Sequence, residues 1–167
     1  MESIRIINVM RVMHVPTELD LEKLYQQFGG KLFRGRPEML LMRMSNGRNI
    51  QLFRRGTIQI LGRLRRQQAE VMRCEVLRRL QISTTAPLVI TNIVISTQLP
   101  MKKLCLRNMN DVGVFYETEL FPAALIHKWQ PAHVALFHNG KVIITGVKSV
   151  EKCYEILTSL IQFLCSK

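Results

Sequence analysis

The 167-residue sequence predicts an α+β fold made of two similar halves, on the evidence of an internal repeat, alternating strand patterns and apolar helical stripes. Residues 8–62 align with residues 92–146 without a gap, at a constant offset of 84 residues, and Leu-Phe, Gly, Ile and Gly recur near the end of both segments. A solenoid repeat is shorter, roughly 20–50 residues. We therefore expect two quasi-equivalent repeats, residues 1–83 and 84–167, joined in one domain.

Each half begins with an apolar strand and continues with three more strands in an antiparallel meander. Alternating apolar residues and β-branched residues predict these strands. Turns are predicted at Asn46-Gly47, Arg54-Arg55-Gly56 and His138-Asn139-Gly140. Asn-Gly, present in the first and third of these turns, adopts the positive φ values that a tight hairpin needs. The predicted strands are residues 6–13, 39–44, 50–53 and 57–61 in the first half and residues 88–96, 123–128, 133–137 and 141–145 in the second.

A helix closes each half, and a shorter helix follows the first strand. Thr17 is the expected N-cap of the short helix, residues 19–27, with Asp20 three positions later in a capping-box arrangement. Gly29 and Gly30 are expected to end this helix. Apolar residues at helical spacing predict the two closing helices. These stripes are Ala69, Met72, Val76 and Leu80 in the first half and Cys153, Ile156, Leu160 and Leu164 in the second.

Helices on one face of the sheet would leave the other face uncovered, so the side chains on that second face are the candidate functional residues. Asn8 and Asn92 occupy matching places among apolar neighbours, which is unusual at the centre of a strand. Such a surface suits the minor groove of DNA, and the alternative is a partner domain packed against it. The predicted face comprises Asn8, Met10, Phe53, Gln59 and Leu61 in the first half and Asn92, Val94, Phe137, Ile143 and Thr145 in the second.

The chain carries an excess of basic residues that is concentrated in its first half. Residues 1–83 contain 16 Lys and Arg against 7 Asp and Glu, a net charge of +9. Residues 84–167 contain 8 against 5, a net charge of +3. A positive surface of this size suits phosphate backbones or acidic protein partners. The alternative is a solubilising surface, although such surfaces usually mix both signs.

The composition argues against a membrane protein, a secreted protein and a metalloprotein. The longest uncharged run, residues 81–101, contains two prolines and many Ser, Thr, Asn and Gln residues, so we do not expect it to span a bilayer. No signal-peptide pattern opens the chain. The four cysteines lack CxxC spacing and the four histidines are scattered, so we expect free thiols, no zinc site and no cofactor.

Several motifs are similar to those of the TATA-binding protein family, TBP. The segment Tyr116-Glu117-Thr118-Glu119-Leu120-Phe121-Pro122 is close to the family's YEPELFP. It is followed by Leu136-Phe137, Gly140-Lys141 and Thr145-Gly146, which are close to the family's IFxSGKxxxTG. In the first half, Leu19-Asp20-Leu21, Met42-Arg43-Met44 and Phe53-x-x-Gly56 keep a thinner version. The sequence resembles the family from Asn8 to about Leu164.

This resemblance implies a saddle, in which two five-stranded repeats form one curved ten-stranded antiparallel sheet with helices on the convex face. In the family, the concave face lies on a widened minor groove and two pairs of Phe wedge between base steps. The implied function is transcription initiation at promoter DNA in the nucleus. Glu117 and Glu119 also suggest an acid/base pair or metal ligands, but no His or third ligand lies nearby in the sequence, so we do not expect an enzyme.

The second half keeps most of the DNA-contacting positions of the family. The resemblance assigns Phe121 and Phe137 as a pair of wedges and Asn92 as the amide that bonds base edges. His127 replaces a family Arg, which weakens one phosphate contact. The other matching positions are Val94, Ile143 and Thr145 on the floor of the site and Lys141 and Lys148 at backbone phosphates.

The first half departs from the family pattern. Asn8 and Phe53 match, but Pro37 occupies the other wedge position, and the carboxylate of Glu38 beside it would repel phosphates. Proline can itself wedge a base step. The remaining departures are Gln51 and Gln59 in place of aliphatic floor residues, Leu61 in place of Thr, and Thr57 in place of a phosphate-binding Lys.

Basic and apolar residues complete the predicted DNA-binding set of the first half, namely Met10, Arg43 and Arg55. Arg54 and Arg55 lie in the same turn and are placed to compensate for the Lys that Thr57 replaces. Because several contacts are nonetheless lost, we expect weakened or altered DNA binding rather than tight recognition of a TATA element.

The resemblance also implies surfaces for protein partners. Glu117, Glu119 and Leu120 match the stirrup that the family offers to transcription factor IIB, and the loop that includes Phe33, Arg34 and Arg36 would face transcription factor IIA. In the family the closing helix of the first half receives acidic regulators, and a solvated helix face is the alternative. The basic residues assigned to such partners are Arg65, Arg66, Arg73 and Arg78. The competing hypothesis for the whole chain is an interaction scaffold that no longer binds DNA directly.

Overall fold

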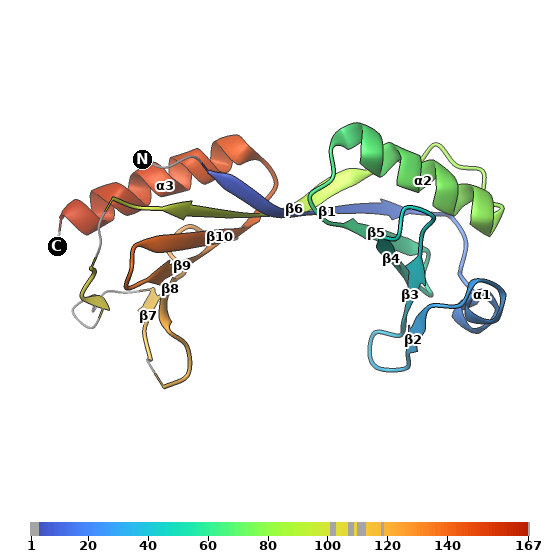
Figure 1. The fold of residues 1–167 in the computed structure, drawn as a ribbon, viewed down its shortest axis with the longest axis horizontal. Helices are drawn as coiled ribbons and strands as arrows, with labels where there is room; N and C mark the ends of the chain where they lie inside the picture. Colours follow the sequence, from blue (N-terminus) through green and yellow to red (C-terminus); the bar gives the residue numbers. More distant parts are fainter. Residues whose placement is uncertain (1–3, 101–102, 107–108, 110–112, 118, 167) are drawn as a thin grey trace. The chain divides into compact units, whose positions relative to one another are not determined.

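The computed structural model describes residues 4–100, 103–106, 109, 113–117 and 119–166. Each repeat runs from a long strand to a closing helix (Figure 1). The first repeat contains β1 (Arg5–His14), α1 (Leu21–Phe28), β2 (Lys31–Phe33), β3 (Met39–Arg43), β4 (Asn49–Phe53), β5 (Thr57–Leu61) and α2 (Arg66–Leu80). The second repeat contains β6 (Val89–Gln98), β7 (Val114–Phe115), β8 (Ala123–Ile126), β9 (His133–Phe137), β10 (Lys141–Val147) and α3 (Val150–Cys165).

The strands form an antiparallel sheet with the order β2-β3-β4-β5-β1-β6-β10-β9-β8-β7. This order confirms the α+β fold that the residue pattern predicts and the ten strands that the family resemblance implies. The chain divides into two compact units, Val9–Ile90 and the described residues of Met1–Asn8 and Thr91–Lys167. We predicted a division between residues 83 and 84, and in the structure the start of β1 groups with the second repeat.

The strand register reproduces the internal repeat pair by pair. Leu52 faces Ile58 across β4 and β5, and their counterparts 84 residues later, Leu136 and Val142, face each other across β9 and β10. The residue opposite Phe53 is Met39, and the residue opposite Phe137 is Ala123, again at the same offset. The repeat seen in the sequence is therefore a repeat of three-dimensional structure.

The hairpin between β3 and β4 differs in detail from the predicted turn. Gly47 has a φ of 76°, but Asn46 keeps a negative φ, so the turn is not the two-residue type in which both central residues have positive φ. The Gly47 amide donates to the Met44 carbonyl, and the Asn46 side-chain oxygen accepts from the Arg48 amide. The Asn side chain thus closes the loop while the Gly alone adopts the left-handed conformation.

The short helix α1 begins two residues later than predicted. Its N-cap is Asp20, whose carboxylate accepts from the Lys23 amide at 3.0 Å, and not Thr17. The Thr17 hydroxyl bonds the carbonyl of its neighbour Glu18 instead. Both residues are good caps, and the first turn of the helix selects the one that directly precedes Leu21, which is fully buried. Gly29 ends the helix, as predicted, with a φ of 69°.

Two short outer strands were not predicted from the residue pattern. Strand β2 has three residues and pairs with β3, while β7 has two residues and pairs with β8. Segments this short cannot show the alternation that identifies a strand. They followed only from the five strands per repeat that the family resemblance implies.

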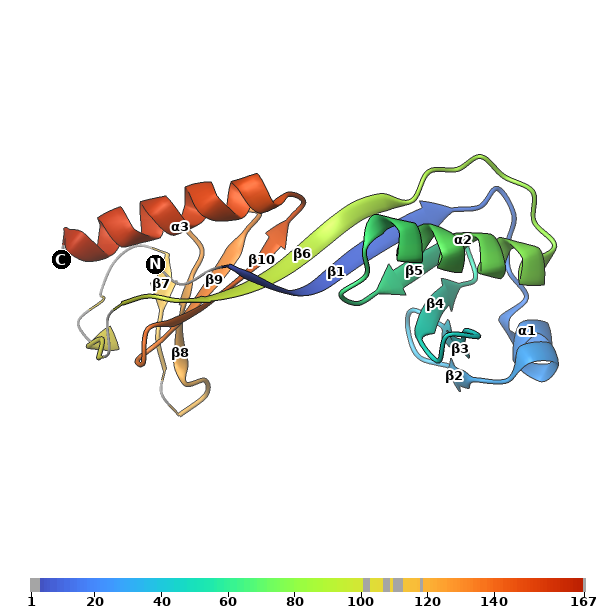
Figure 2. The same cartoon turned by 45° about the horizontal axis from the view of Figure 1, so that its top comes forward.

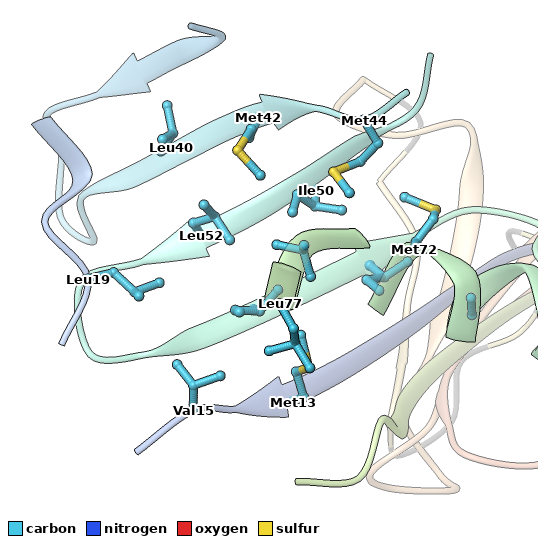
Figure 3. Close-up of a cluster of buried hydrophobic side chains, with 14 of the residues drawn as sticks. Met13, Val15, Leu19, Leu40, Met42, Met44, Ile50, Leu52, Met72 and Leu77 are labelled. Carbon is cyan, nitrogen blue, oxygen red and sulfur yellow. The ribbon is translucent and has the colours of Figure 1, made fainter. Parts of the chain in front are cut away.

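A closing helix covers one face of each repeat (Figure 2). The buried side chains of α2 and α3 belong to the core on that face. In the first repeat, Met72 and Leu77 of α2 lie among strand side chains that include Ile50 (Figure 3). Burial of each such side chain contributes about 1.5–3 kcal/mol. Leu80, predicted to belong to the stripe, is only partly buried because it is the last residue of α2, and Leu77 occupies the core in its place. No helix of the described residues is long and apolar enough to cross a membrane.

Candidate nucleic-acid interface

The face of the sheet that the helices leave uncovered carries the predicted functional side chains. Alternate residues of a strand point to opposite faces. In β4 and β5, Leu52 and Ile58 are fully buried beneath α2, whereas Phe53, Gln59 and Leu61 are half-buried on the other side. The second repeat shows the same alternation, and its half-buried set again matches the prediction: Asn92, Val94, Phe137, Ile143 and Thr145.

Two aromatic rings come together on this face of the second repeat. Phe121 precedes β8 and Phe137 ends β9, and their ring centroids lie 6.1 Å apart at 59°. Phe121 is 43% exposed, which is unusual for a large apolar residue. The Lys141 ammonium lies 5.7 Å from the Phe137 centroid, so a positive charge flanks the two rings. Lys148 is likewise exposed.

Asn92 has a structural role that the sequence did not reveal. Its side-chain oxygen accepts from the Gly146 amide at 2.8 Å, at the place where the register of β10 against β6 shifts. Its amide nitrogen lies 3.3 Å from the Thr145 hydroxyl. The oxygen is thereby committed to the protein, so Asn92 presents mainly N–H groups to any ligand on this face. Donors of this kind match the acceptors of A·T base pairs in a minor groove.

His127 and His133 form a pair at the margin of the same face. Their Nδ1 atoms lie 2.7 Å apart and the rings meet edge to face. One nitrogen must donate and the other accept, so the bond exists only while at least one ring is neutral. In the first repeat the matching positions hold Arg43 and Asn49, which are partners across β3 and β4. The second repeat therefore has a hydrogen-bonded histidine pair where the first has Arg43 beside Asn49.

The first repeat has an apolar hollow where the second repeat has its two rings. A cavity of about 520 Å³ is lined by Pro37, Glu38, Phe53, Arg54, Arg55, Thr57 and Gln59. Glu38 binds Arg54 in an ion pair, with Arg54 Nη2 2.6 Å and Nε 3.0 Å from the same carboxylate oxygen. The Glu38 hydrogen bond, more than its charge alone, raises the pKa of Arg54.

This ion pair changes two expectations drawn from the sequence. The Glu38 carboxylate is neutralised within the protein, so its repulsion of phosphate is weaker than its charge suggests. Arg54, however, is occupied by Glu38 and does not stand free to replace the missing Lys at Thr57. Arg55 is exposed and remains the candidate for that phosphate contact.

The predicted contact residues for transcription factors IIA and IIB are exposed, and all but Phe33, which ends β2, lie in loops. Leu120 is 73% exposed, and Glu117 and Glu119 are exposed beside it, while Thr118 lies outside the described residues. On the first repeat, Phe33 is 37% exposed beneath the Lys31 ammonium, and Arg34 pairs with Glu22 of α1 at 2.9 Å. Arg36 is also exposed.

The basic residues of α2 are not equivalent. Arg65, Arg66 and Arg78 are exposed, as a partner surface requires. The Arg73 side chain is only 17% exposed and donates to the carbonyls of Thr84 and Ala86. Arg73 thus connects the segment after α2 to the helix. These contacts favour a structural role for Arg73 over a place on a partner surface. No group of three or more His, Cys, Asp or Glu that could hold a metal occurs among the residues that the structure describes.

These features define a class of protein: a two-repeat α+β protein whose open sheet face carries paired aromatic rings and flanking cations. The family model described as transcription factor TFIID, or TATA-binding protein, matches residues 87–166. A TBP-related factor of Drosophila melanogaster is 31% identical, over 98% of this chain and 77% of that protein. A TATA-box-binding protein of Methanococcus vannielii is 28% identical, over 91% of this chain and 88% of that protein.

The fold agrees with these sequence matches. The solved structure of Methanococcus jannaschii TBP superposes with a TM-score of 0.80, covering 99% of this chain and all of that one at 24% sequence identity. The chain belongs to the TATA-binding protein family, a family of transcription factors. The resemblance found in its motifs is thereby confirmed.

Proposed function

We propose that this protein is a nuclear transcription initiation factor that binds promoter DNA in the minor groove through the uncovered faces of its repeats. The observation that carries the proposal is the Phe121 and Phe137 pair, with Asn92 and Thr145 on the same face of the second repeat. An exposed ring and a half-buried ring next to a cation suit insertion between base steps, and the Asn92 donors suit base-edge acceptors. Lys141 and Lys148 supply charge for the flanking phosphates.

The first repeat supports altered rather than absent recognition. Asn8, Met10 and Phe53 offer the same kinds of groups as their counterparts in the second repeat, and Arg43 and Arg55 are exposed cations. Only one ring faces Pro37 there, in place of the pair in the second repeat. The proposed DNA contacts are therefore stronger in the second repeat, and selectivity for a TATA element is expected to be reduced.

Transcription factors IIA and IIB are the proposed protein partners. The exposed Leu120, which follows Glu117 and Glu119, supports a IIB contact, and Phe33 at the end of β2 with Arg34 and Arg36 after it supports a IIA contact. Arg65, Arg66 and Arg78 on α2 support a contact with acidic regulators.

A gel-shift titration with TATA and non-TATA duplexes, with and without factors IIA and IIB, tests the proposal. We expect a complex with DNA whose affinity falls as salt rises, and a further shift when the factors are added. Absence of a DNA complex under every condition would overturn DNA binding. A DNA complex that neither factor shifts would overturn the recruitment role alone.

An interaction scaffold without DNA binding is the second candidate function. The Glu38 ion pair favours it, because it occupies Arg54 and so removes a free cation from the face where DNA would lie. Promoter activity after the double substitution Phe121→Ala and Phe137→Ala separates the two functions. Loss of activity supports insertion into DNA, whereas unchanged activity supports the scaffold.

A further inference from the structure

Two glutamine side chains stand opposite each other on the uncovered face of the first repeat. Gln51 of β4 and Gln59 of β5 are direct partners in the strand register. Leu41 and Val12 continue the same row on the neighbouring strands. Both Gln residues are half-buried, and neither side chain has a hydrogen-bond partner within the described residues. The row therefore contains two unpaired amides between apolar neighbours.

The second repeat has no amide in the corresponding row. At the constant offset of 84 residues, Ala135 and Ile143 replace the two glutamines and are likewise partners in the register. Leu125 and Ser96 continue that row. The backbone frame is thus the same in both repeats, and the chemical difference in the middle of the row is confined to two carboxamides.

An amide that no group of the protein occupies is available to a ligand that can bond it. Neither glutamine has a buried unpaired amide atom, so a ligand on this row exchanges the glutamines' hydrogen bonds to water for bonds of its own. Each carboxamide offers one oxygen acceptor and two N–H donors. An apolar pair such as Ala135 and Ile143 offers neither.

The minor groove presents a chemical difference that these groups can read. A·T base pairs show only the acceptors adenine N3 and thymine O2, whereas G·C adds the donor N2 amine of guanine. Against an apolar pair such as Ala135 and Ile143, this amine would lose its hydrogen bond to water without replacement, so G·C is disfavoured there. Against a glutamine oxygen, the same amine finds an acceptor.

Resting on the proposed minor-groove binding, we propose that Gln51 and Gln59 allow the first repeat to accept G·C base pairs through a hydrogen bond to the guanine N2 amine. The second repeat, with Ala135 and Ile143, keeps a preference for A·T. The binding site for this protein is then composite, with a G·C-tolerant half and an A·T half.

Inosine provides a test at the level of one amino group, because an I·C pair lacks the N2 amine and is otherwise like G·C. Each A·T pair of a bound duplex is replaced in turn by G·C and by I·C, and the dissociation constants are compared at one salt concentration. In one half of the site we expect G·C to bind about threefold to tenfold more tightly than I·C. In the other half we expect I·C to bind more tightly than G·C.

The variant that identifies the residues is Gln51→Ala with Gln59→Ile, which copies the second repeat. We expect it to invert the preference in the G·C-tolerant half, so that I·C is bound more tightly there. The matched control is Gln67→Leu on the exposed side of α2, which removes one carboxamide far from the row and should leave both preferences unchanged.

The outcomes separate this inference from the proposed function. If the wild-type protein binds no duplex, minor-groove binding itself is wrong. If it binds but prefers I·C at every position, or if the double variant keeps the preference for G·C, DNA binding stands and the role of Gln51 and Gln59 is overturned.

Discussion

Glu38 and Arg54 show how one ion pair sets the local electrostatics of the uncovered face of the first repeat. The Glu38 side chain is 28% exposed and the Arg54 side chain 55% exposed, so solvent screens their attraction and the pair adds little to folding stability. The ion pair has a larger effect on the binding of a polyanionic ligand than on folding stability. Arg54 cannot contact a phosphate and Glu38 at the same time with the same donors.

Replacement of Glu38 by Gln is expected to strengthen DNA binding. The substitution removes a carboxylate from the face and releases Arg54, so the salt dependence of the binding constant should steepen by about one phosphate contact, a slope change of about 0.9. Fluorescence anisotropy with a labelled duplex at several salt concentrations measures both quantities. Glu22→Gln is the control, because it breaks the exposed Arg34 pair and changes the net charge equally. Equal effects of both substitutions would contradict a local role for Glu38.

Arg11 is a charged residue within the core side of β1. It is 8% exposed, its Nη2 donates to the Leu64 carbonyl at 3.1 Å, and its Nη1 has no hydrogen-bond partner within the described residues. Burial lowers the pKa of Arg11, and the charge of Glu70 opposes this. A guanidinium in this position stabilises the fold less than an apolar side chain of similar length would.

The substitution Arg11→Met is expected to leave the free energy of unfolding unchanged or to raise it by about 1 kcal/mol, because it removes an unpaired donor and keeps the volume. Urea denaturation measures this change. Arg11→Ala, by contrast, leaves a void and should lower the free energy of unfolding by about 1–3 kcal/mol. A large loss of stability in the Met variant would show that the charge itself holds the structure.

At the scale of elements, a hydrogen-bonded cluster joins the end of α2 to the hairpin between β3 and β4. Glu75 accepts from the Ser45 amide at 3.0 Å and from the Ser45 hydroxyl at 2.7 Å. Arg79 donates to Glu75 and to the Arg43 carbonyl. Burial alone would raise the pKa of Glu75, but the Ser45 and Arg79 bonds together hold it below its usual range.

Glu75→Gln is therefore expected to destabilise the protein in a pH-dependent manner. Because the pKa of Glu75 is lower in the folded state, its contribution is complete above the unfolded pKa of about 4.3 and is lost as the pH falls through the folded value. At pH 7 we expect the variant to lose about 1–2 kcal/mol in the free energy of unfolding. The difference between variant and wild type should become smaller below about pH 4. Denaturation from pH 7 to pH 3 measures it, and Glu155→Gln, at an exposed pair with Lys152, is the control. A difference that grows in acid would contradict this role.

The sequence predicted the long elements and missed the short ones. The apolar stripe of α2 and the apolar runs of β4 and β5 recur in the second half of the chain. Each pattern predicted an element that the structure contains. By contrast, the N-cap at Asp20 depended on a choice between two good caps that only the packing of the helix decides.

The candidate site was predictable where a residue acts alone and unpredictable where two residues meet. Alternation along the strands placed Phe137 and Gln59 on the uncovered face. The Glu38 pair with Arg54 joins residues 16 positions apart, and no local pattern indicates that contact. The Asn92 bond to Gly146 depends on a shift in strand register, which residue periodicity does not show.

At the scale of the whole molecule, charge and aromatic residues are distributed in opposite ways. The first half carries most of the net charge, +9 against +3, while the second repeat carries the pair of rings on its uncovered face. Charge gives salt-dependent attraction to any duplex, whereas rings inserted between base steps bend the duplex. The two repeats are therefore expected to contribute differently to affinity and to DNA bending.

This division predicts unequal effects of removing the aromatic residues. Phe121→Ala with Phe137→Ala should abolish most of the bending of a bound duplex, because both rings of the second repeat are lost. Phe53→Ala should reduce bending less, because Pro37 remains beside it to occupy a base step. Energy transfer between dyes at the two ends of a duplex, recorded at saturating protein, measures the bend independently of affinity. Since the basic residues are untouched, the salt dependence of both variants should stay close to that of the wild type. Equal losses of bending from the two repeats would show that the second repeat does not dominate the distortion.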